Sequence, residues 1–288
     1  MRTVSRETTR GRLVFDVVEH GPADGDPVLL LHGFPQRASS WTGVASRLAG
    51  RGYRCLAPDQ RGYSPGARPP GRRDYVLSEL TADALAVVDD AVGSTGRVHL
   101  VGHDWGAAVG WALAAQHPDR LRSFTAVSVP PAAAMGRALL TGRQALASWY
   151  MAFYQLPGLP ERLLGAHGRE FSGRLAAALR RAGQSAPAAE RDAAGLADPA
   201  ALTAALNWYR AIPLARGATP ARPVRVPTLF VWSDGDVAIT RQAAMLAGRH
   251  VEAPFRFVEL RGVSHWIPDE APAELAELIA GHLAAHPG

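Results

Sequence analysis

Short apolar runs recur along the chain and are separated by longer segments in which apolar residues follow helical spacing. Runs that are rich in β-branched and other apolar residues and end at turn signals predict buried β-strands. They cover residues 13–18, 28–31, 54–57, 98–101, 124–129, 228–232 and 255–260. Strands that alternate with helical segments predict a mainly parallel sheet with helices on both faces.

The helical pattern is clearest at residues 77–92, 105–116 and about 273–284. Between residues 130 and about 224, strand-like runs disappear, and alanine-rich amphipathic segments replace them. These segments cover residues 142–153, 174–182 and 200–211. The sequence therefore predicts a helical cap at residues 131–224, between a first core part at residues 1–130 and a second core part at residues 225–288.

Composition narrows the range of functions. The chain has 288 residues, of which 47% are hydrophobic and 20% charged, as expected of a globular protein. All 31 basic residues are arginines scattered along the chain, so the net charge of +5 does not indicate nucleic-acid binding. The single cysteine, Cys55, lies in a predicted buried strand and is interpreted as a core residue. Without an apolar leader or a long apolar run, we expect a cytoplasmic protein with no membrane insertion.

A predicted strand, turn and helix surround Asp104. The strand at residues 98–101 leads into Gly102-His103-Asp104-Trp105-Gly106, and a helix of small residues follows. Glycines two residues before and after the central position let the backbone turn sharply and expose the central side chain above a sheet. A helix cap would also explain an aspartate at a helix start. The buried strand before it, a second motif upstream and a histidine downstream favour a nucleophile.

The upstream motif is His32-Gly33-Phe34-Pro35, which directly follows the predicted strand at residues 28–31. A loop at this place contributes one backbone N–H group to an oxyanion hole when the nucleophile lies on a strand-to-helix turn. We therefore expect the N–H groups of Phe34 and Trp105 to form an oxyanion hole.

His265 is the candidate general base, because its loop lies between the last predicted strand and the final helix, at the carboxyl ends of the strands. An acid that orients it should follow the strand at residues 228–232, where both Asp234 and Asp236 occur. We favour Asp236, because the turn gives it room to face His265 while Asp234 shapes the Asp-Gly turn. The reverse assignment stays open.

Together these motifs resemble the epoxide hydrolase and haloalkane dehalogenase branch of the α/β-hydrolase superfamily, over nearly the whole chain. The resemblance implies an α/β-hydrolase fold, with a mostly parallel central sheet flanked by helices and a helical cap inserted after the sixth strand. It also implies that the Asp104 carboxylate attacks a saturated carbon to give an alkyl ester. Water activated by His265 and Asp236 would then hydrolyse the ester. A small hydrophobic epoxide and water are the implied partners, and no cofactor is implied.

Two cap segments resemble the tyrosine-bearing cap segments of epoxide hydrolases, at residues 149–158 and 206–210. By this resemblance, Tyr150 and Tyr209 hold and protonate the oxygen of the opening epoxide, a role that suits a phenol. Tyr154 lies in the same segment as Tyr150 and is its rival for the role.

Two other functions stay as alternatives. A haloalkane dehalogenase would use the same nucleophile, but we would expect a halide-binding asparagine or tryptophan where Phe34 stands. Fluoroacetate dehalogenases carry arginines soon after the nucleophile, where this chain has Ala107, Ala108 and Val109. A non-catalytic small-molecule-binding protein of the same fold is the other alternative. The physiological substrate, the selectivity and the oligomeric state, a homo-oligomer included, stay open.

Overall fold

The structure is a computed structural model that describes residues 2–8, 11–164, 168–214 and 222–287. At its centre lies an eight-stranded sheet in the order β1-β2-β4-β3-β5-β6-β7-β8. The strands are β1 (Arg2–Thr8), β2 (Gly11–His20), β3 (Asp26–Leu31), β4 (Tyr53–Pro58), β5 (Val98–His103), β6 (Leu121–Val127), β7 (Thr228–Gly235) and β8 (Phe255–Ser264). The pairs that β2 forms with β1 and with β4 are antiparallel, and the other pairs are parallel.

All seven predicted strands occur in this sheet, but β1 was not predicted. It is an edge strand that pairs with β2 alone, and Val4 is its only buried residue. The ion pair of Arg6 with Asp83 helps to hold it against the neighbouring helix. An edge strand with polar residues on both sides carries no apolar run, so the hydrophobic pattern does not reveal it.

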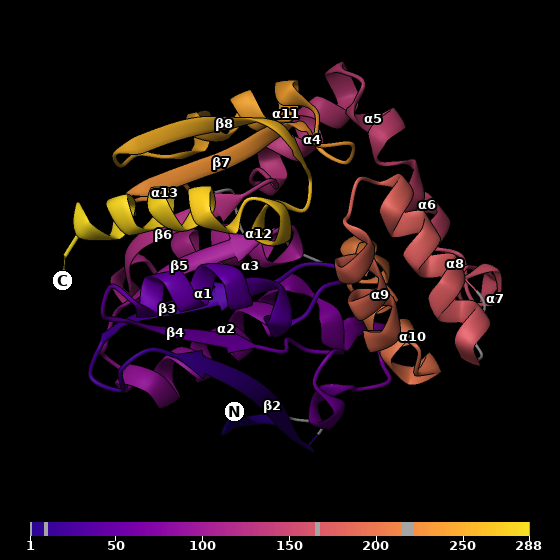
Figure 1. Cartoon of the computed structure of the whole chain (residues 1–288), viewed down its shortest axis with the longest axis horizontal. Helices are drawn as coiled ribbons and strands as arrows, with labels where there is room; N and C mark the ends of the chain where they lie inside the picture. Colours follow the sequence, from indigo (N-terminus) through magenta and orange to yellow (C-terminus); the bar gives the residue numbers. More distant parts are fainter. Residues whose placement is uncertain (1, 9–10, 165–167, 215–221, 288) are drawn as a thin grey trace.

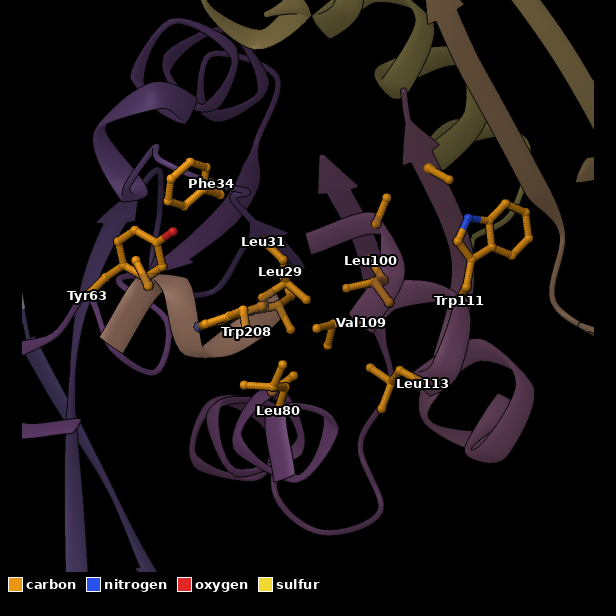
Figure 2. Close-up of a cluster of buried hydrophobic side chains, with 14 of the residues drawn as sticks. Leu29, Leu31, Phe34, Tyr63, Leu80, Leu100, Val109, Trp111, Leu113 and Trp208 are labelled. Carbon is orange, nitrogen blue, oxygen red and sulfur yellow. The ribbon is translucent and has the colours of Figure 1, made fainter. Parts of the chain in front are cut away.

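Helices cover both faces of the sheet, as Figure 1 shows. Two pack together on one face, α2 (Leu77–Val92) and α3 (Trp105–Gln116), and two on the other, α1 (Thr42–Ala49) and α13 (Pro272–Ala284). Successive side chains of a strand point to opposite faces. Accordingly, Leu29 and Leu31 belong to the core cluster under α2 and α3, part of which is drawn in Figure 2. Val28 and Leu30 belong to the cluster under α1 and α13.

In the part of the chain that the structure describes, seven α-helices lie between β6 and β7 and form the cap. They are α4 (Ala132–Thr141), α5 (Gln144–Ala147), α6 (Trp149–Tyr154), α7 (Leu159–Leu163), α8 (Gly168–Arg181), α9 (Ala186–Gly195) and α10 (Pro199–Arg210). Two short helices belong to the second core part, α11 (Arg241–Met245) and α12 (Ile267–Glu270). One-turn 3₁₀ helices occupy Ala38–Trp41, Pro65–Ala67, Arg72–Tyr75, Pro118–Arg120, Ile212–Leu214 and Ala247–His250. In Figure 1, α6 to α10 gather at one end of the sheet.

The predicted continuous helix at residues 142–153 is wrong. The structure has two short helices there, α5 and α6, which are separated at Ser148. Tertiary contacts decide this break, because the Gln144 side chain donates to the Ser148 hydroxyl at 2.9 Å and to the carbonyl of Ala238 at 2.7 Å. Its amide oxygen accepts from the Thr240 backbone at 2.9 Å. These contacts bind α5 to the loop after β7, and local spacing does not reveal them.

Polar contacts hold the cap on the core at several points. The Trp208 indole N–H donates to the carbonyl of Arg61 at 2.8 Å. Arg37 donates to the carbonyl of Gly195 at 2.9 Å. The guanidinium of Arg191 in α9 forms a two-pronged ion pair with Asp269 of α12, and both N–O distances are 2.8 Å. These contacts fix α9 and α10 on the core, and α10 carries Tyr209.

Candidate active site

Asp104 lies on a sharp turn between β5 and α3, with φ 52° and ψ −119°. A positive φ is uncommon for a residue with a side chain and costs on the order of 1–3 kcal/mol. The flanking glycines make the turn possible. A Cβ atom on Gly106 would lie 2.1 Å from the carbonyl oxygen of Leu31, and one on Gly102 would lie 2.3 Å from the carbonyl oxygen of Gly106. The turn therefore has the geometry that the glycine spacing predicts.

Two backbone N–H groups hold the Asp104 carboxylate. Phe34 donates to Oδ1 at 2.8 Å, and a backbone hydrogen bond from Trp105 helps to keep the pKa of Asp104 low. A Cβ atom on Gly33 would lie 2.3 Å from the same carboxylate oxygen, so only glycine permits this close approach of the loop. The two amides expected to form an oxyanion hole thus both point at the carboxyl group of Asp104.

His265 lies between Asp104 and Asp236. Its Nδ1 is 2.7 Å from Oδ2 of Asp236, and its Nε2 is 3.7 Å from Oδ2 of Asp104. The other oxygen of Asp236 accepts from the backbone N–H groups of Ala238 and Ile239 at 2.8 and 2.9 Å, which fixes the carboxylate. The structure places Asp236, and not Asp234, beside the histidine.

Asp234 has a different position. Its carboxylate is exposed and accepts from the backbone N–H of Gly262 at 2.7 Å. The pairing of β7 with β8 shifts its register between Ser233 and Gly235, and such an irregularity re-aims the side chains that follow it. The two aspartates therefore point to different surroundings although they are only two residues apart.

Burial and neighbouring charges have opposite effects on the pKa values of Asp104 and His265. Burial alone would raise the pKa of Asp104, but the charge of His265, 3.7 Å away, keeps that pKa below the usual range. Burial alone would lower the pKa of His265, but the charge of Asp236, the hydrogen bond to that carboxylate and the charge of Asp104 raise it. The arrangement favours an imidazolium between two carboxylates as long as Asp104 carries its charge.

Cap tyrosines pack against Phe34 and Trp105, the two residues whose backbone N–H groups hold Asp104. The ring of Tyr209, on α10, lies 5.2 Å from the ring of Trp105 and 5.4 Å from that of Phe34. The ring of Tyr150, on α6, lies 6.1 Å from that of Tyr209. Tyr154 packs against Tyr209 and Phe34, with ring centroids 5.0 and 5.6 Å away. All three phenols therefore lie in one aromatic cluster over the Asp104 turn.

The pKa values of the phenols separate Tyr150 from Tyr154. Burial raises the pKa of Tyr150, and the negative charge of Asp104 raises it further. For Tyr154 burial alone raises the pKa, to about 12. Burial also raises the pKa of Tyr209, with contributions from Tyr150 and Asp104. Among these three cap tyrosines, those whose pKa responds to the charge of Asp104 are thus Tyr150 and Tyr209.

A chain of buried polar groups behind His265 was not predicted. His103 places Nε2 at 2.9 Å from the carbonyl oxygen of His265 and Nδ1 at 2.9 Å from the side-chain oxygen of Gln36. The amide of Gln36 donates to Asp269 at 2.7 Å, and Asp269 is the partner of Arg191 in the cap. Only its position next to Asp104 in the sequence could have pointed to His103. Asp269 and Arg191 are far apart in the sequence, so no local pattern indicates their contact.

Within residues 2–8, 11–164, 168–214 and 222–287, no group of three or more histidine, cysteine or acidic residues is placed to hold a metal ion. In the same part of the chain, no helix combines the length and apolar character needed to cross a membrane.

Comparison with known proteins gives a consistent result. Residues 26–272 match the family described as alpha/beta hydrolase fold. The chain is 33% identical to Epoxide hydrolase A of Mycobacterium tuberculosis over 91% of its own length and 92% of the relative. It is also 33% identical to the AB hydrolase superfamily protein YfhM of Bacillus subtilis over 94% of each chain.

Solved structures agree with the sequence comparison. The crystal structure of epoxide hydrolase VrEH1 from Vigna radiata superposes with a TM-score of 0.81 at 27% identity, over 97% of this chain and 96% of that one. Epoxide Hydrolase A from Mycobacterium thermoresistibile superposes with a TM-score of 0.78 at 26% identity, over 98% of both chains. The likeness therefore extends over the core and the cap.

Proposed function

The chain belongs to the alpha/beta hydrolase fold family and is a hydrolase acting on ether bonds, and we propose that it opens epoxides to vicinal diols. The reaction proceeds through an ester of Asp104. One observation carries the mechanism. A carboxylate stands on the nucleophile turn, within reach of His265 on one side and close to two cap phenols on the other. A carboxylate in this position suits attack on a saturated carbon.

In the first step, an oxygen of Asp104 bonds to one epoxide carbon, and the bond from that carbon to the epoxide oxygen breaks. The developing alkoxide receives a proton from a phenol. Tyr150 and Tyr209 fit this role because they are protonated cap phenols near Asp104, whose charge adds to the effect of burial in raising their pKa values. An alkoxide is more basic than a phenolate, so the proton moves toward the substrate oxygen. The product of this step is an alkyl ester of Asp104.

In the second step, His265 removes a proton from a water molecule, which attacks the carboxyl carbon of Asp104. The N–H groups of Phe34 and Trp105 then stabilise the oxyanion, and each such donor typically contributes about 2.7–4 kcal/mol to lowering the barrier. Collapse of this intermediate releases the diol and restores the carboxylate. The leaving oxygen takes up the proton that His265 removed from water, and the proton left on the carboxyl group of Asp104 returns to the phenolate of the first step, so that imidazole, carboxylate and phenol are all restored.

Formation of the ester also prepares the base. The Asp104 carboxylate is one of the groups that raise the pKa of His265. Esterification removes its negative charge, so the pKa of His265 falls and the neutral imidazole becomes more populated. The histidine is therefore a stronger candidate for a base after the first step than before it.

In this proposal the cap and the core supply different catalytic groups. The cap at residues 131–224 supplies the acid, and the core supplies the nucleophile, the base and the oxyanion donors. The aromatic surroundings, which include Phe34, Trp105 and Tyr154, favour a small hydrophobic epoxide over a charged substrate.

The test is product formation from two substrate panels. Aryl and alkyl epoxides are assayed for diol formation, and chloroalkanes and bromoalkanes for halide release. We expect diol formation by the wild type and by Asp234→Ala, a matched control in which an exposed aspartate is lost, and none by Asp104→Ala. Halide release without diol formation would contradict the proposal in favour of a dehalogenase, and silence on both panels would contradict it in favour of a binding protein.

A further inference from the structure

The outer side of the cap exposes many large apolar side chains. Among the described residues, seven of the ten exposed large hydrophobic side chains lie between residues 139 and 163. Leu140, Leu146 and Trp149 are 89%, 71% and 67% exposed. We call Leu140, Leu146, Trp149, Leu156, Leu159 and Leu163 the outer cap face. Scattered apolar residues on a surface are normal, but clusters of this kind mark interaction sites.

Continuity of the helices supports a single surface. The helices α4, α5, α6 and α7 follow one another in the chain, α4 contacts α5, and α5 contacts α6. Both α6 and α7 also contact α10, which lies on their inner side. In Figure 1, α5 and α7 lie at the outer edge of the cap, away from the central sheet.

Net positive charge is concentrated in the same part of the chain, because acidic residues are few there. Residues 131–224 contain eleven arginines and five acidic residues, whereas the rest of the chain contains twenty arginines and twenty-one acidic residues. The cap therefore accounts for the positive net charge of the whole protein. Such an asymmetry indicates an anionic partner for this region.

Exposed arginines accompany the outer cap face itself. Arg137, Arg143 and Arg162 are exposed on or beside its helices, and within the described part of the chain none of them forms an ion pair. The only acidic residue from 131 to 164 is Glu161, whose carboxylate is bound by Arg210 at 2.7 Å. The face thus presents apolar side chains and positive charge together.

We propose that the outer cap face docks on the surface of an anionic lipid bilayer. Leucine and tryptophan side chains enter the boundary between headgroups and acyl chains, and arginines bind anionic headgroups. A second copy of this chain fits less well, because it would bring the same positive charge to the interface. A nucleic acid would satisfy the arginines but would leave the leucines without partners.

Docking through this face would bring the candidate active site close to the bilayer. Trp149 is exposed on α6, while the next residue, Tyr150, packs toward Tyr209. A docked cap would therefore hold the tyrosine-bearing helix next to the bilayer. Apolar epoxides partition into bilayers, so the substrate class would be epoxides dissolved in lipid, an inference that rests on the proposed function.

Vesicle sedimentation tests the proposal. We expect the full chain to sediment with vesicles that contain phosphatidylglycerol, to bind pure phosphatidylcholine vesicles much less, and to bind less as salt increases. Leu146→Glu and Arg143→Glu should each lower the partition coefficient roughly tenfold or more. Arg47→Glu, a matched change at an exposed arginine of α1, should leave it unchanged. All three variants should hydrolyse a water-soluble epoxide at the wild-type rate.

Three results would overturn the proposal. The first is the absence of binding to phosphatidylglycerol vesicles, and the second is equal binding by Arg143→Glu and the wild type. The third is a dimer in light scattering that Leu146→Glu dissociates and that binds no vesicles, which would assign the face to a second copy. Asp104→Ala should bind vesicles normally, so a failure of the proposed activity and a failure of docking give different results.

Discussion

At the scale of single residues, two buried carboxylates share one imidazole. The side chains of His265 and Asp236 are 5% and 0% exposed, so water does not screen their interaction. Asp236 is also fixed by two backbone N–H groups, which leaves His265 little freedom to turn away from Asp104. The orientation of the base is therefore built into the loops after β7 and β8, and substrate does not have to induce it.

The cap tyrosines allow a test at this scale. Tyr150→Phe should lower kcat/KM for epoxide opening roughly ten- to a hundredfold, because it removes one of the two hydroxyl groups that we propose to donate a proton. Tyr154→Phe should have little effect, because burial alone raises its pKa and the charge of Asp104 contributes nothing to it. Steady-state kinetics on one epoxide compare the two variants. A larger loss for Tyr154→Phe would exchange their roles.

The residues of the candidate site differ in how well the sequence predicts them. That Asp104 and His265 lie together could be predicted, because their motifs follow predicted strands. The choice between Asp234 and Asp236 could not be settled from spacing, because it depends on a register shift between β7 and β8. His103 and Gln36 have roles only through tertiary hydrogen bonds, which no local pattern reveals.

At the scale of elements, the contact between α9 and α12 joins the cap to the segment that carries the base. Arg191 binds both Asp269 and the neighbouring Asp192, whose side chain is only 1% exposed. Asp269 lies four residues after His265 and also accepts from Gln36. A planar guanidinium suits such two-pronged contacts with carboxylates.

Arg191→Gln should therefore destabilise the protein. Loss of the guanidinium leaves two buried or half-buried carboxylates without their cation, and we expect the free energy of unfolding to fall by roughly 1–3 kcal/mol. Chemical denaturation measures it. Arg47→Gln, at an exposed arginine of α1, serves as the control and should change stability very little. Equal stability of the Arg191 variant and the wild type would show that the contact contributes nothing.

The sequence predicts the helices of the core better than those of the cap. The helices at residues 77–92 and 105–116 were predicted with their observed ends, because each follows a turn signal and packs directly on the sheet. In the cap, α10 was predicted to within one residue at each end, whereas α4, α7 and α9 were not predicted. Their short lengths and their contacts with other helices decide their ends, and alanine-rich sequence marks such ends weakly.

At the scale of the whole molecule, burial of histidines links stability to pH. His32, His99 and His282 are 0%, 1% and 8% exposed. Burial lowers the pKa of each to about 4, which favours the neutral form in the folded state. Each has a hydrogen-bond partner, such as the hydroxyl of Ser123 at 2.8 Å from Nδ1 of His99. In the unfolded chain these side chains take up protons near pH 6.5.

Stability should consequently fall as the pH decreases from about 6.5 to about 4. In this range the unfolded state binds more protons than the folded state, and each such proton changes the free energy of unfolding by up to ~1.4 kcal/mol per pH unit. Urea denaturation at a series of pH values measures the slope. His99→Gln removes one titrating group and should flatten it. An equal slope in the variant would contradict this account.

The fold of the whole chain could be predicted because its evidence is distributed over many segments. Seven strands, the helices between them and the gap in the strand pattern at the cap all point to one architecture. The surface of the cap could not be predicted in the same way. Which leucines face outward depends on how short helices pack, and a helical pattern alone does not distinguish a face that covers the site from one that meets a partner.

The fate of water oxygen in a single turnover distinguishes an ester of Asp104 from direct attack of water on the epoxide. Enzyme in excess over an epoxide is allowed to react once in water enriched in ¹⁸O, and the diol and the peptide that contains Asp104 are weighed by mass spectrometry. If Asp104 forms the ester and water attacks its carboxyl carbon, the diol is unlabelled and the label lies in Asp104. A labelled diol with unlabelled Asp104 would show direct attack of water on the epoxide and would contradict the ester mechanism.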